Sequence, residues 1–94
     1  MKNEDYFEIE SHIITRKLGN ELVVLNISNG EYYGLNEVGA RVWEFMAGGK
    51  RFDEISKTLV NEYDVAESVV ENDLTRLLKE LLEVGLIKIN TNRL

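Results

Sequence analysis

From Ile9 to Leu35, hydrophobic and polar residues follow a period of two. This alternation is typical of half-buried β-strands. Two dipeptides, Gly19-Asn20 and Asn29-Gly30, interrupt it, and both favour the left-handed backbone angles of hairpin turns. The pattern predicts a three-stranded antiparallel meander over Ile9–Lys17, Glu21–Ile27 and Glu31–Leu35.

Two-residue hairpin loops would set the register of this meander, with Ile14 opposite Leu25 and Ile27 opposite Tyr32. One face of the sheet then presents Ile14, Val23, Leu25, Ile27 and Tyr32, and the other presents Ile13, Leu22, Val24, Asn26, Tyr33 and Leu35. The first face is more uniformly apolar, so we expect it to cover the core. A shift of one residue would exchange the two faces.

After Asn36, a favourable N-cap residue, the period changes from two to 3.6. The spacing predicts one helix that ends at Gly48-Gly49, a second over Phe52–Tyr63 and a third over Glu67–Glu83, before a short strand over Leu86–Asn90. The inward positions are expected at Val38, Val42, Phe45, Met46, Phe52, Ile55, Leu59, Val69, Val70, Leu74, Leu77, Leu78, Leu81 and Leu82. The apolar stripe of the third helix is wider than one neighbouring element requires.

The predicted elements make an α+β fold, a three-stranded antiparallel sheet followed by three helices. We expect an N-terminal arm over residues 1–9, one domain over residues 10–90 and a C-terminal tail over residues 91–94. The arm is expected to be loosely held, because the alternation begins only at Ile9.

Composition narrows the functional classes. Hydrophobic residues make up 44% of the chain and charged residues 30%, as in ordinary globular proteins. There is no cysteine, no apolar run of the roughly 18 residues that cross a membrane, and no apolar core of a secretory signal at the N-terminus. We therefore expect a cytoplasmic protein that acts without a membrane.

The net charge of −6 argues against nucleic acid as a partner, because affinity for nucleic acid comes from neutralised phosphates. The helices and the hairpin resemble a winged helix, so DNA binding is the alternative from another functional class. The helix that would enter the major groove carries Arg76 and Lys79 against Glu67, Glu71, Asp73, Glu80 and Glu83. This face would be repelled by phosphates.

Candidate chemistry is sparse. The single histidine, His12, lies in a predicted strand, no metal-ligand spacing contains it, and the glycines form no phosphate-binding loop. The carboxylates gather at helix starts and exposed helical positions, where they favour the helix dipole and solubility. We expect no catalytic residue, no metal ligand and no cofactor, and hence no enzyme.

The strand Glu31–Leu35 is the most informative candidate for binding. It is short, it enters from one hairpin and it ends at Asn36, so we expect it at the edge of the sheet with one side unpaired. An extended peptide can add to such an edge as a further strand.

The segment Gly30–Trp43 followed by Gly48-Gly49 resembles the core motif of PqqD-like proteins, the recognition elements for precursor peptides that are made on ribosomes and then modified. Phe52–Ile55 is similar to the start of the family's second helix, and residues 73–87 are similar to its third helix and exit. The resemblance covers roughly residues 10–90 and implies a winged-helix-like fold and a non-enzymatic adaptor. Such an adaptor binds the leader of the precursor peptide as an added strand and presents it to a modifying enzyme.

The resemblance implies a peptide-binding site of two parts. The edge is Glu31, Tyr32, Tyr33, Gly34 and Leu35, and the groove wall is drawn from Val70, Asp73, Leu74, Leu77 and Leu81. Asp73 is expected to meet a basic side chain of the leader. Periodicity leaves open which face of the third helix lines the groove.

Two pathways suit such a protein. In lasso-peptide maturation the partner is a leader peptidase, and in pyrroloquinoline quinone synthesis it is a radical-SAM enzyme. The sequences Tyr-Tyr-Gly-Leu-Asn and Gly-Ala-Arg-Val-Trp are more similar to those of the lasso-type proteins.

Overall fold

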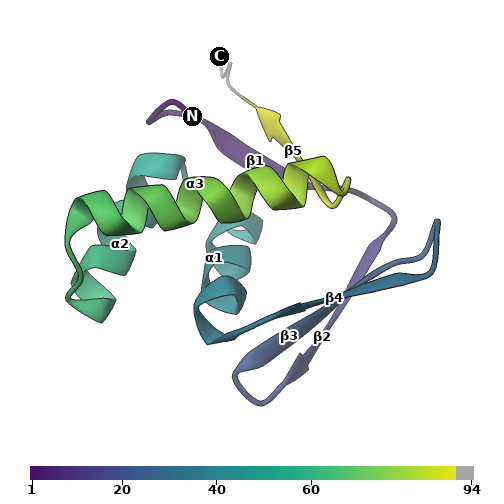
Figure 1. Ribbon diagram of the computed structural model, residues 1–94. Coiled ribbons are helices and arrows are strands. Elements are labelled where there is room, and N and C mark those ends of the chain that lie inside the picture. Colours follow the sequence, from purple (N-terminus) through teal and green to yellow (C-terminus); the bar gives the residue numbers. More distant parts are fainter. Residues whose placement is uncertain (91–94) are drawn as a thin grey trace.

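The computed structural model describes residues 1–90 and has two small antiparallel sheets and three helices (Figure 1). Its elements are β1 (Tyr6–Ile9), β2 (Ile13–Leu18), β3 (Glu21–Asn26), β4 (Glu31–Leu35), α1 (Glu37–Ala47), α2 (Phe52–Tyr63), α3 (Glu67–Glu83) and β5 (Ile87–Asn90). The predicted fold class is confirmed, since the three-stranded sheet β2-β3-β4 precedes three helices. Helix α1 contacts both sheets, and α3 packs against α2.

The N-terminal residues differ from the expectation. The predicted first strand, Ile9–Lys17, begins only at Ile13, as β2. Ile9 instead ends a separate strand, β1, which pairs with β5. Asp5 and Phe7 are each 2% exposed, so residues 5–9 are part of the packed structure and not a loose arm. Sequence patterning missed this pair because its two strands are about eighty residues apart. The expected tail, residues 91–94, lies outside the described residues.

The register of β2 and β3 is the predicted one, with Ile14 opposite Leu25. The register of β3 and β4 is shifted by two residues, so that Tyr32 lies opposite Leu25 rather than Ile27. The cause is a four-residue loop in place of the expected two-residue turn. Asn26 closes this loop, because its side-chain Oδ1 accepts from the Ser28 N–H at 2.9 Å and its carbonyl accepts from the Gly30 N–H at 2.8 Å.

The expected core face of the sheet is wrong. Leu22, Val24 and Leu35 are at most 8% exposed and face the helices, whereas Ile14, Ile27 and Tyr32 are 54, 55 and 70% exposed. Both faces carry enough apolar side chains to cover a core, so the docking of the helices decided between them. We call the solvent side of the sheet the outward face; its cross-strand rows are Ile14–Leu25–Tyr32, Arg16–Val23–Gly34 and Leu18–Glu21.

The helices follow the sequence closely. Asn36 is the N-cap of α1, and its Oδ1 accepts from the Gly39 N–H at 2.9 Å. α2 and α3 have the predicted boundaries. Most of the expected inward positions are buried or partly buried against the core, but Val38 and Val69 are 41 and 47% exposed. These two exceptions lie at the site described next.

Candidate functional site

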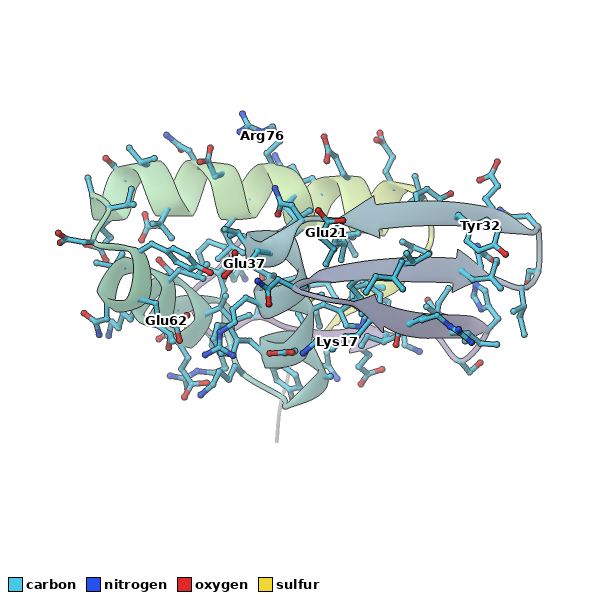
Figure 2. The ribbon with its side chains drawn as sticks, turned by 90° about the horizontal axis from the view of Figure 1, so that it is seen from below. Lys17, Glu21, Tyr32, Glu37, Glu62 and Arg76 are labelled. Carbon is cyan, nitrogen blue, oxygen red and sulfur yellow. The ribbon has the colours of Figure 1, made fainter. Side chains whose placement is uncertain are left out.

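The strand β4 forms one edge of its sheet, because the strand order is β2-β3-β4. Figure 2 shows that α3 and the strands of this sheet run along a similar direction. The opposite edge, β2, carries Arg16 and Lys17, and charged side chains on an edge strand discourage pairing with further strands. β4 has no lysine or arginine. Of the two edges, β4 is therefore the one open to an additional strand.

A hollow of about 510 Å³ lies between the end of β4 and the three helices. We call it the β4–α3 groove; it is lined by Gly34, Leu35, Asn36, Val38, Gly39, Val42, Leu59, Tyr63, Val65, Val69, Val70, Asp73, Leu74, Arg76 and Leu77. Its volume falls in the range of small-ligand sites, and most of its lining side chains are aliphatic. An apolar groove beside a free strand edge is suited to an extended peptide.

Six of the ten site residues predicted from the sequence line this groove: Gly34, Leu35, Val70, Asp73, Leu74 and Leu77. Leu81, which is 4% exposed, belongs to the core and is not among the lining residues. The other three predicted residues, Glu31, Tyr32 and Tyr33, are in β4 beyond the end of the groove. The structure therefore brings together the C-terminal end of β4 and the first half of α3.

The two tyrosines of β4 lie on opposite sides of the sheet. Tyr32 belongs to the outward face and is 70% exposed at the far end of the strand (Figure 2). Tyr33 is half-buried on the core side, and its hydroxyl donates to Glu31 Oε1 at 2.6 Å. This hydrogen bond to the carboxylate raises the pKa of Tyr33 above its ordinary value, so the phenol stays neutral.

Sequence reasoning missed Val65, Leu59 and Tyr63 as groove residues, and it assigned Val38 and Val69 to the core. Val38, Val65 and Val69 are 41, 37 and 47% exposed. The one sequence signal for these groove residues was the wide apolar stripe of α3, which has more apolar residues than packing in the core requires. Leu59 and Tyr63 belong to α2, and Val65 lies in the turn before α3. The periodicity of α3 does not show which residues of other segments pack beside it.

The groove has one ion pair at its rim. Arg76 donates to Asp73 Oδ1 at 2.8 Å, and the two side chains are 70 and 61% exposed. An exposed ion pair one helical turn apart contributes little stability. Asp73 or Arg76 can therefore leave this pair and bind a charged group of a ligand instead. Asp73, expected to meet a basic side chain, is thus at the groove but already paired.

Charged residues connect α1 to α2 and to β2. The Arg41 Nε–H donates to Glu62 Oε1 at 3.1 Å, and Lys17 Nζ lies 3.3 Å from Glu44 Oε2. Hydrogen bonds from Arg41 and then Lys17 lower the pKa of Glu44. Within residues 1–90 no group of three or more His, Asp or Glu side chains is placed to hold a metal ion. Over the same residues no helix is long and apolar enough to cross a membrane.

Comparison with known proteins points to one family. The model of the family described as coenzyme PQQ synthesis protein D (PqqD) matches residues 21–87. No curated protein is found to be similar to the chain. The solved complex of TbiB1 with the TbiA(beta) leader peptide has a TM-score of 0.83 at 33% sequence identity, over 86% of this chain and 94% of that chain. A lasso peptide synthetase B1 complexed with the leader peptide has a TM-score of 0.82 at 26% identity, over 87% of this chain and 96% of that chain.

Proposed function

The chain belongs to the PqqD family, and on this premise we propose that it is a non-enzymatic adaptor for a ribosomally made precursor peptide. It binds the leader of the precursor by strand addition to β4 and delivers the leader to a modifying enzyme. The observation that carries the proposal is the position of the β4–α3 groove, which continues directly from the open edge of the sheet. The leader-bound state of both similar structures supports it.

Both the edge and the groove are needed to hold a flexible leader. Ordering a peptide costs about 1–2 kcal/mol per residue, while each backbone hydrogen bond returns about 0.5–1.5 kcal/mol. Pairing along Glu31–Leu35 alone is therefore insufficient. Apolar side chains of the leader, each contributing about 1.5–3 kcal/mol on burial, make up the difference when they enter the groove.

The binding roles divide between the two parts of the site. The backbone of Glu31, Tyr32, Tyr33, Gly34 and Leu35 pairs with the leader strand. Val70, Leu74 and Leu77 form the wall that receives its apolar side chains, and Asp73 exchanges Arg76 for a basic residue of the leader. Leu81 supports the wall from the core side, since it is buried in the same helix.

The proposal is tested by titrating the isotope-labelled protein with the leader encoded by a short reading frame beside its gene. We expect amide shifts to cluster at residues 31–38 and 65–77. The same leader with its apolar residues changed to serine is the control, and it should bind at least about tenfold more weakly, the loss expected for one anchor. Shifts spread evenly over the protein, or confined to β2, would contradict strand addition at β4.

For delivery, we propose that the enzyme docks on the outward face. Ile14 and Tyr32 are more than half exposed on this face, and exposed apolar patches mark interaction sites. A leader strand beside β4 would extend the same face by one strand, so an enzyme seated there contacts adaptor and leader together. The enzyme of our proposal is a lasso-type leader peptidase, and the alternative within the family is a radical-SAM enzyme. The gene beside that of the precursor distinguishes them.

A further inference from the structure

Arg16 is the one arginine of residues 1–90 for which no ion pair is found. Arg41, Arg51 and Arg76 each contact a carboxylate of this chain, and even Lys17, the next residue in β2, lies 3.3 Å from Glu44. Arg16 points from the middle of β2 to the outward face and is exposed. Its guanidinium is therefore free to bind a group from another molecule.

Most of the side chains around Arg16 on the outward face are apolar, and one is acidic. Its row across the sheet continues with Val23 and Gly34, and the row on one side is Ile14, Leu25 and Tyr32. The row on the other side pairs Leu18 with the acidic Glu21, whose carboxylate forms no ion pair with Arg16 within residues 1–90. A partner that covers these side chains removes Arg16 from water as well. An arginine buried without a counter-charge is strongly unfavourable, so a partner that binds this face tightly has to supply an anion.

The third residue of the Arg16 row is Gly34, which has no side chain. Its backbone has no positive φ, and a Cβ placed on it would meet no atom within 4 Å. Neither strain nor crowding inside this chain requires glycine there, although glycine weakens a strand. A glycine in a strand also marks the close approach of another molecule. Its missing side chain leaves a shallow notch beside Val23, in the row of Arg16.

We infer that the Arg16–Val23–Gly34 row receives an acidic side chain of the enzyme, whose carboxylate pairs with Arg16 while apolar residues cover Ile14 and Tyr32. This inference rests on the proposed docking of the enzyme on the outward face and adds the chemistry by which the face selects its partner. A guanidinium binds a carboxylate through two parallel hydrogen bonds, so the pair also sets the orientation of the enzyme. The chain carries a net charge of −6, which repels an acidic surface from most other approaches.

The experiment compares two variants that each remove one positive charge. Arg16→Met keeps the length of the side chain, and Lys57→Met does the same on the exposed side of α2, away from both surfaces. For each protein, fluorescence anisotropy with labelled leader gives the affinity of the groove. Biolayer interferometry of the leader-loaded protein with the peptidase encoded in the same gene cluster gives the affinity of the outward face.

We expect Arg16→Met to leave leader affinity unchanged and to weaken enzyme binding about 30-fold or more, as when one partner of a buried charge pair is removed. Arg16→Lys should restore part of the loss, and Lys57→Met should leave both affinities within about twofold. The inference is overturned if Arg16→Met binds the enzyme equally well or more tightly, because an apolar contact alone would benefit from the loss of charge.

Different results would contradict the role of Arg16 and the docking of the enzyme on the outward face. If Ile14→Asp abolishes enzyme binding while Arg16→Met does not alter it, the enzyme docks on the outward face and the role of Arg16 is wrong. If the unmodified, leader-loaded protein binds no peptidase, delivery through this face is wrong as well. A concentration-dependent dimer in analytical ultracentrifugation that Ile14→Asp disrupts would assign the face to a second copy of the chain and overturn both.

Discussion

A Cβ atom placed on Gly39 in α1 would lie 3.2 Å from the Cβ of Leu35 in β4. This distance is shorter than ordinary contacts between such atoms, so the absent side chain allows the helix to begin directly against the strand. The Gly39 N–H also donates to the N-cap side chain of Asn36. The junction between β4 and α1, which forms one end of the groove, is therefore tightly packed at residue 39.

We predict that Gly39→Val lowers the free energy of unfolding by about 1–3 kcal/mol, the range for overpacked sites, as measured by urea denaturation. Gly48→Ala is the control, because its Cβ would meet its nearest atom at 3.5 Å and its φ is −83°. That variant should stay within about 0.5 kcal/mol. Equal stability of Gly39→Val and the unmodified protein would show that the junction has room.

Val69 and Leu18 provide a matched pair for the peptide-binding site. Their side chains are 47 and 56% exposed, on the groove and on the opposite edge strand. Val69→Asp should weaken leader binding about 10- to 100-fold, because it replaces an apolar contact of about 1.5–3 kcal/mol by a charge. Leu18→Asp should leave leader affinity unchanged. Isothermal titration calorimetry measures both, and similar losses in the two variants would place the peptide elsewhere.

The assignment of the two sheet faces is tested by stability. Leu22 is 7% exposed and Ile14 is 54% exposed. Leu22→Ala should cost about 2–5 kcal/mol of unfolding free energy, and Ile14→Ala should cost less than about 0.5 kcal/mol. Thermal and chemical unfolding curves of the two variants give the comparison. The reverse order would restore the face expected from the sequence.

The N-terminal residues should be required for stability. Phe7 is 2% exposed in β1, so Phe7→Ala is predicted to lower the free energy of unfolding by about 3–5 kcal/mol. Glu8→Ala, exposed in the same strand, serves as the control and should have a small effect. If Phe7→Ala were as stable as Glu8→Ala, residues 1–9 would behave as the arm that was expected at first.

Acid pH should weaken the contacts of α1 through Glu44. Hydrogen bonds from Arg41 and then Lys17 lower its pKa, so the folded state favours the carboxylate. A depressed folded pKa gives a stability contribution that is complete above the pKa of the unfolded chain and is lost as the pH falls through the folded pKa. Carboxyl chemical shifts measured by NMR should show Glu44 titrating below ordinary glutamates. In Arg41→Met it should move back toward them; no movement would exclude Arg41 as the cause.

Local physical chemistry is enough to place most elements of this protein from its sequence. Asn36 caps α1 through its own side chain, and the periodicities of two and 3.6 locate β3, β4 and all three helices because both patterns arise from neighbouring residues. The family motif lies in one continuous segment, so the proposed leader-binding role could also be stated before the fold was known.

Tertiary packing decided the rest. Both faces of the β2–β4 sheet are apolar enough to be buried, and the contact with α1 selected Val24 while leaving Tyr32 in solvent. The pairing of β1 with β5 and the hollow between β4, α2 and α3 join residues from distant parts of the chain. The energy of such contacts depends on how elements are oriented in space, and no pattern within one segment contains that information.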